Sequence, residues 1–143
     1  LSLAELKSVF SDDKLELLAN KTAFLYTRKE LNFQNLNSKL GGVVKIGIIK
    51  KEINKDQINK ELLSYLTHNY QDSSKKIPFG LSVYGNKSFN IKSLAMDLKQ
   101  KLKEKGVKSR WVDSKKAKLS SVSVKENNLV DLGVEFNLFF NYY

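Results

Sequence analysis

The chain has 143 residues, 41% of them hydrophobic, and its 25 Lys and Arg against 15 Asp and Glu give a formal net charge of +10. This length allows one ordinary domain or two very small ones, with enough apolar side chains for a core. It contains no cysteine, which excludes disulfides and fits a reducing, cytoplasmic setting. No apolar run approaches the roughly 20 residues of a membrane helix, so we expect no membrane partner. Because the chain starts with Leu and ends in an apolar stretch, we expect a fragment or processed product.

The chain's first segment predicts a helix followed by a hairpin. Ser2 and Glu5 have capping-box spacing, and an apolar face follows over residues 3–10. Two short apolar runs then flank Asn20-Lys21, which predicts a β-hairpin with its turn there.

A second helix and a strand are predicted next. The helix covers residues 31–40 and turns three apolar side chains inward, namely Phe33, Leu36 and Leu40. Gly41-Gly42 predicts a left-handed helix stop, and the β-branched residues 43–49 predict a strand.

A third helix is predicted over residues 55–70, with Asn54 as its cap. Its inward side chains are Ile58, Leu62, Tyr65 and Leu66. The polar residues 71–76 predict a loop, which is a candidate boundary between a small first unit and a second one.

The remaining elements alternate. They are a strand over 79–85 directly after Pro78, a turn over 85–88, an amphipathic helix over 91–105 that stops at Gly106, a strand over 109–113, a short helix from Ser120-Ser121 toward 129, and a strand over 134–140. This alternation predicts an α+β fold of mixed sheets with helices packed on one face, of the ferredoxin-like kind.

No catalytic constellation is visible. The single histidine, His68, has no cysteine or second histidine to join it, so it is expected on the surface or at its boundary. Gly41-Gly42 lacks the surroundings of a dinucleotide or phosphate-binding loop. We therefore expect no cofactor or metal in this chain.

Positive charge is concentrated in residues 75–125, which hold 14 Lys and Arg against three acids. Lysines in a loop, beside Arg110 at a strand end, are suited to contact phosphates. The double serine at the start of a helix is suited to form a phosphate-binding site. The alternative is that the lysines only solvate a surface and the serines only cap a helix. Trp111 and Tyr84 are each expected either in the core or stacked on a base.

Several of these segments resemble the THUMP module, in the version found in tRNA guanine-N2 methyltransferase-type enzymes. The resemblance lies in Phe79-Gly-Leu-Ser-Val-Tyr-Gly85, the lysine helix after it, Ser109-Arg-Trp-Val112 and Leu119-Ser-Ser-Val-Ser-Val-Lys-Glu-Asn-Asn-Leu129. Leu1-Ser-Leu-Ala-Glu-Leu6 and Leu40-Gly-Gly-Val-Val-Lys-Ile46 are similar to the ferredoxin-like unit that precedes THUMP. The family's usual strand before the first of these is absent here.

The resemblance implies a ferredoxin-like unit over residues 1–53 and a THUMP-like RNA-binding unit over 54–143. It implies that the chain docks tRNA or another structured RNA for a separate methyltransferase domain, which would use S-adenosylmethionine. That domain's glycine-rich loop and Asn/Asp-Pro-Pro-aromatic motif are absent from this sequence. The RNA-binding residues expected from charge and resemblance together are Lys87, Arg110, Lys115, Lys116, Lys118, Ser120, Ser121, Lys125 and Asn127, with Lys99 and Lys103 as an extension.

Two other functions are compatible with the sequence. The chain is alternatively a basic interaction or scaffold domain without an RNA partner. A ferredoxin-like ligand sensor is the third reading, and it would need an apolar pocket with convergent polar groups.

Overall fold

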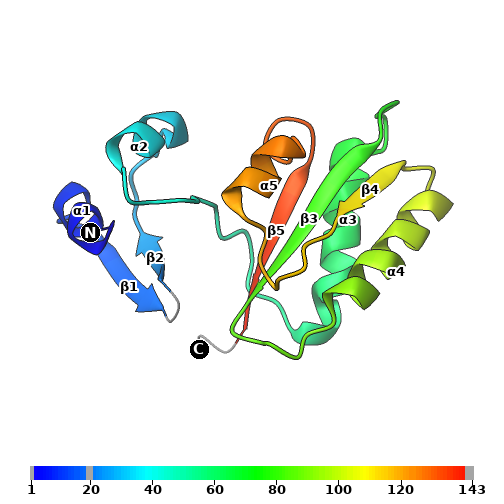
Figure 1. Cartoon of the computed structure of the whole chain (residues 1–143), viewed down its shortest axis with the longest axis horizontal. Coiled ribbons are helices and arrows are strands. Elements are labelled where there is room, and N and C mark those ends of the chain that lie inside the picture. Colours follow the sequence, from blue (N-terminus) through cyan, green and yellow to red (C-terminus); the bar gives the residue numbers. More distant parts are fainter. Residues whose placement is uncertain (1, 19–20, 141–143) are drawn as a thin grey trace. The chain divides into compact units, whose positions relative to one another are not determined.

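The computed structural model describes residues 2–18 and 21–140 and has two compact units, Leu1–Lys50 and Lys51–Tyr143 (Figure 1). We call them unit 1 and unit 2. The fold is α+β, with a two-stranded antiparallel sheet in unit 1 and a three-stranded parallel sheet in unit 2. Neither sheet is mixed, so that part of the predicted fold class is wrong.

Unit 1 contains α1 (Ser2–Val9), β1 (Lys14–Leu18), β2 (Thr22–Tyr26) and α2 (Phe33–Lys39). The two strands form the predicted hairpin, in which Leu18 pairs with Thr22. Lys21 has the left-handed φ of 61° that such a tight turn requires, while Asn20 lies outside the described residues. The small core of this unit centres on Phe10, Leu36 and Leu40.

Other expectations for unit 1 are wrong. Phe33, predicted to face inward, is 38% exposed. The Glu5 carboxylate accepts a hydrogen bond from the amide of Gly42 at 3.0 Å, whereas the Ser2 side chain of the predicted capping box lies outside what the structure describes. Among the described glycines only Gly85 and Gly106 have positive φ, so Gly41-Gly42 is not a left-handed stop.

Residues 43–49 form no strand, and Val44, Ile48 and Ile49 are exposed. Their β-branched side chains favour an extended backbone. A strand also needs a hydrogen-bonded neighbour, however, and the described strands of unit 1 pair only with each other.

Unit 2 alternates helices with parallel strands. Its elements are a 3₁₀ turn η1 (Lys55–Gln57), α3 (Ile58–Tyr70), β3 (Ile77–Tyr84), α4 (Ile91–Glu104), β4 (Ser109–Val112), α5 (Ser121–Glu126) and β5 (Val134–Phe139). The strand order is β4-β3-β5, with β3 in the centre. The polar residues 71–76 join α3 to β3 inside this unit.

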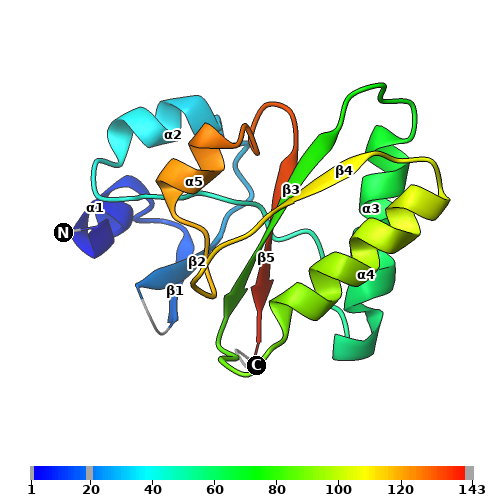
Figure 2. The same ribbon diagram turned by 45° about the vertical axis from the view of Figure 1, so that its right-hand side comes forward.

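Strand β3 is buried on both faces, as the central strand of a parallel sheet must be. Phe79 and Leu81 pack into the main core with α3 and α4, whereas Gly80 faces Leu119 and Leu129 on the side of α5. Figure 2 shows α5 on one side of the sheet and α3 with α4 on the other. The expectation of helices on one face is therefore wrong.

The predicted helix stripe of α4 is confirmed, because Leu94, Ala95, Leu98 and Leu102 are all buried. The predicted inward position of Tyr65 on α3 is wrong, because that side chain is 37% exposed and meets Phe136 edge-on with ring centroids 5.5 Å apart.

Pro78 lies inside β3 rather than before it, and Gly133 passes directly against its carbonyl group. A Cβ atom on Gly133 would overlap the Pro78 carbonyl oxygen, so this close approach requires glycine.

We predict that Gly133→Ala destabilises unit 2 by about 1–3 kcal/mol or more, because the backbone of the central strand would have to move. Urea unfolding followed by the fluorescence of Trp111, the single tryptophan, measures this in unit 2. Gly47→Ala, in unit 1, where a Cβ would meet nothing within 4 Å, should leave the Trp111 unfolding midpoint unchanged. Equal unfolding midpoints for the two variants would contradict the packing described here.

Candidate nucleic-acid interface

The basic loop between β4 and α5, residues 113–120, is hydrogen-bonded to the central strand, and we call it the tethered loop. The Val83 amide donates to the Ala117 carbonyl at 2.8 Å, and the Leu119 amide donates to Ser82 Oγ at 2.9 Å. Within the loop, the Ser114 hydroxyl donates to the Lys118 carbonyl at 3.2 Å. The loop therefore runs alongside the second half of β3, beyond the point where β4 ends.

Ser82 is the centre of this attachment. Its side chain is 0% exposed, and its hydroxyl also donates to Glu135 Oε1 on β5 at 2.7 Å. One buried hydroxyl thus joins the central strand, the basic loop and the edge strand β5. Leaving either partner unpaired in this environment would cost stability.

The loop holds Lys118 on an aromatic surface. The Lys118 ammonium lies 4.6 Å from the ring centroid of Tyr84, and Tyr84 stacks on Phe139 with centroids 4.6 Å apart and planes 15° from parallel. We call these three side chains the platform. A cation fixed over an aromatic ring keeps its charge while losing rotational freedom.

The platform lies at the carboxyl ends of β3 and β5. The chain leaves β3 through α4 to reach β4, then crosses back through α5 to reach β5 on the other side of β3. The connections therefore change direction at the β3–β5 pair. In open parallel sheets, the crevice outside the carboxyl ends at such a switch point is the usual place for ligands.

Four of the predicted RNA-binding residues lie at or near this end of the sheet. Lys118 belongs to the platform, Lys115 and Lys116 are exposed in the tethered loop, and Lys87 is exposed in the loop that follows β3. These lysines add positive charge around the switch point.

A second group lies at the opposite end of β3. Arg110 pairs in register with Pro78, and its guanidinium donates to Asn127 Oδ1 at 2.9 Å. Lys125 is exposed in the last turn of α5. Because Pro78 and Tyr84 are six residues apart on the strand, this group is about 20 Å from Lys118. The predicted set is thus two groups rather than one patch.

The double serine starts α5 as predicted, with Ser120 as the N-cap. The Ser120 hydroxyl accepts from the Ser123 amide at 3.0 Å, and Ser121 is the first helical residue. Since α5 has only six residues, its dipole is small, and the serines are accounted for by capping.

Positive charge also lies on the other layer of unit 2. Lys99 and Lys103 belong to α4, which packs on the opposite face of the sheet from Arg110 and α5. The charge of this unit therefore surrounds it rather than forming one face.

Trp111 packs against the main core, which agrees with the core reading of this side chain. His68 is exposed, as expected. Sequence reasoning missed Phe139, because only the pairing of Tyr84 with Phe139 across the β3–β5 ladder makes it part of the platform.

Within residues 2–18 and 21–140, no cluster of three or more His, Asp or Glu side chains could hold a metal ion. The same residues include no helix with both the length and the apolar character that crossing a bilayer requires. No family model matches this chain, and comparison with curated proteins and with solved structures gives no match.

We predict that Ser82→Ala releases the basic loop. The Leu119 amide would lose its acceptor, so its hydrogen exchange should accelerate at least about tenfold, and unit 2 should lose about 1–3 kcal/mol. Hydrogen-exchange NMR and urea unfolding measure the two effects. Ser88→Ala serves as the control, because that hydroxyl donates to nearby Asn86 and, among the described residues, to no other group. Unchanged exchange at Leu119 would show that the loop is held in another way.

Proposed function

We propose that this chain is an RNA-binding module that docks structured RNA, most simply tRNA, through its sugar–phosphate backbone. The observation that supports this most directly is the platform, in which a tethered loop holds Lys118 over Tyr84 at the switch point of a parallel sheet. Lysines neutralise phosphates, and aromatic rings beside them accept the faces of bases or riboses. A net charge of +10 favours a polyanion over other ligands.

The two groups of cations suit a large, structured nucleic acid. Arg110 and Lys125 at one end of β3 and Lys118 at the other are about 20 Å apart, which is more than neighbouring phosphates of one strand span. A folded RNA presents phosphates at such separations, and it is recognised largely by shape and backbone.

The resemblance to the THUMP module makes this proposal more specific. The residues that carry the resemblance occupy β3, α4, β4, the tethered loop and α5 of unit 2. We propose that unit 2 is the THUMP-like unit and unit 1 the ferredoxin-like unit before it. The chain would then be the tRNA-docking portion of an S-adenosylmethionine-dependent RNA methyltransferase, with methyl transfer performed by a domain outside these residues.

One observation favours the alternative of a basic interaction domain without an RNA partner. Lysines lie on both layers of unit 2, on α4 as well as on the loop beside α5. A partner that needs only a diffuse positive field, such as an acidic protein, would suit that distribution. Competition of poly-glutamate against RNA separates the two functions, because RNA docking predicts that RNA binds far more tightly at equal charge.

We predict that RNA affinity falls steeply with salt, with a slope of log affinity against log salt near one per phosphate contact. Replacing Lys115, Lys116 and Lys118 together with Ala should lower that slope by up to about three and weaken binding at low salt. Fluorescence anisotropy with a tRNA transcript measures both. The fold should persist, because none of the three side chains is buried.

The matched control removes the same charge from unit 1, by changing Lys7, Lys39 and Lys50 to Ala, all of which are exposed. If the control weakens binding as much as the loop variant, the platform is not the docking site. A salt-independent affinity, or no binding at low salt, would exclude the proposed function.

A further inference from the structure

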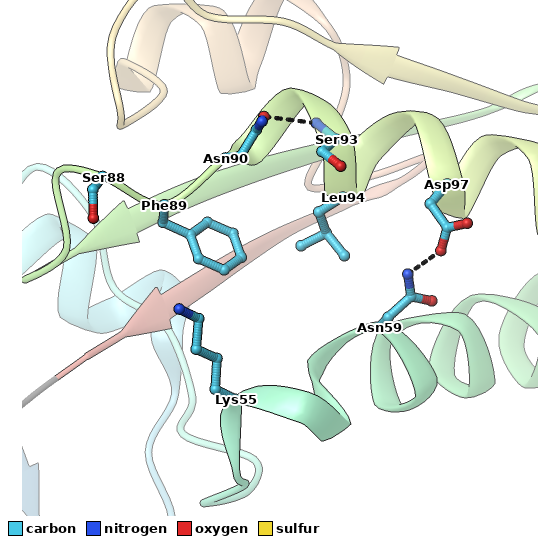
Figure 3. A pocket seen from close by; sticks show the side chains of 8 residues that line it. All are labelled: Lys55, Asn59, Ser88, Phe89, Asn90, Ser93, Leu94 and Asp97. Carbon is cyan, nitrogen blue, oxygen red and sulfur yellow. Dashed lines mark hydrogen bonds between the residues drawn. The ribbon is translucent and has the colours of Figure 1, made fainter.

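Unit 2 has a pocket of about 430 Å³ between the start of α3 and the loop that joins β3 to α4 (Figure 3). We call it the edge pocket. It is lined by residues of the loop that follows β3, and the platform contains Tyr84, the last residue of that strand. Its volume is within the range of about 300–1,000 Å³ that small-ligand sites have.

One wall of the edge pocket is apolar and aromatic. Phe89 lines it, and the Phe89 ring also packs against Phe140 with centroids 5.0 Å apart, which fixes its position. Leu94 continues this wall from the first turn of α4. A rigid aromatic side chain in an open pocket suits stacking with a flat ring.

Three of the lining side chains have a hydrogen-bond donor that pairs with no group in the described part of the chain. The Lys55 side chain extends toward Phe89 (Figure 3), and within the described part of the chain its ammonium has no hydrogen bond or ion pair. Asn90 uses its carbonyl oxygen to accept from the Ser93 amide at 2.9 Å, which leaves its NH₂ group for a ligand. The Ser93 hydroxyl is the third donor. An ammonium with two neutral donors suits a phosphate group.

At the other end of the pocket, the Asp97 carboxylate is a hydrogen-bond acceptor that two neighbouring side chains hold in position. Asn59 donates to the Asp97 carboxylate, and Lys101 donates to Asp97 at 2.8 Å and to Asn59 Oδ1 at 3.3 Å. The hydrogen bonds from Lys101 and Asn59 lower the pKa of Asp97 below its usual 3.8. Asp97 is therefore a carboxylate at neutral pH and can only accept, for example from a ribose hydroxyl or a base amino group.

We infer that the edge pocket binds one unpaired nucleotide of the docked RNA, with its base against Phe89, its phosphate at Lys55 and Ser93, and a ribose or base donor on Asp97. This inference rests on the proposed RNA binding. The proposed function alone recognises RNA by its shape and charge, and the edge pocket would add selection of an unpaired nucleotide. Bases splayed out of a helix and stacked on aromatic side chains are the usual targets of specific RNA recognition.

The experiment compares two RNA duplexes that differ only in one bulged nucleotide. Wild-type protein should bind the bulged duplex about tenfold more tightly, since stacking one base contributes enough free energy for that factor. Lys55→Ala should abolish most of this preference while binding the fully paired duplex as the wild type does. Amide NMR shifts of Ser93 and Asp97 should change with the bulged duplex only. Lys60→Ala, in the first turn of α3 and outside this pocket, should keep the preference.

Equal wild-type affinity for the two duplexes would overturn this inference and leave the proposed function standing. A preference that Lys60→Ala loses as fully as Lys55→Ala would overturn the assignment to this pocket. Failure of the wild type to bind either duplex would instead overturn the proposed function on which the inference rests.

Discussion

The organisation of unit 2 depends on β3 being buried on both faces. Because its two faces meet different cores, the strand must alternate large side chains toward α3 and α4 with small ones toward α5. Gly80 and Ser82 are those small residues. Ser82 is the one buried polar side chain among the described residues, and its hydroxyl joins the basic loop and β5 to the central strand. The small residues on this face of β3 therefore determine both the packing of the sheet and the position of the candidate site.

This attachment changes what the lysines of the loop can do. Exposed lysines on a mobile loop give a diffuse positive field, and ordering them on a ligand costs side-chain entropy. Here the backbone of the loop is fixed to Val83 and Ser82, and Lys118 already lies over Tyr84. Folding has already restricted the Lys118 side chain, so binding a ligand costs little further conformational entropy. A phosphate at this position would therefore bind more tightly to Lys118 than to a freely rotating lysine. The edge pocket lies near the same end of the sheet, and in the proposed complex it would bind an unpaired nucleotide.

The sequence was most informative where one local pattern decides the structure. The stripe of α4, the stop at Gly106 and the hairpin around Lys21 are all predictable, because period and turn chemistry act over a few residues. Strand pairing is not local, so local patterns could not predict the parallel order β4-β3-β5, nor that residues 43–49 form no strand. The same limit applies to the site: the lysines were visible in the sequence, but Phe139 and the separation of Arg110 from Lys118 depend on register.

The central claim is that RNA meets unit 2 at the carboxyl ends of β3 and β5. An NMR titration of the labelled chain with a tRNA transcript tests it most directly, through the amide shifts of every residue at low and high salt. The account predicts that the largest changes fall on residues 84–87 and 115–118 and shrink as salt rises. Changes confined to the outer face of α4, around Lys99 and Lys103, with the platform silent, would contradict it.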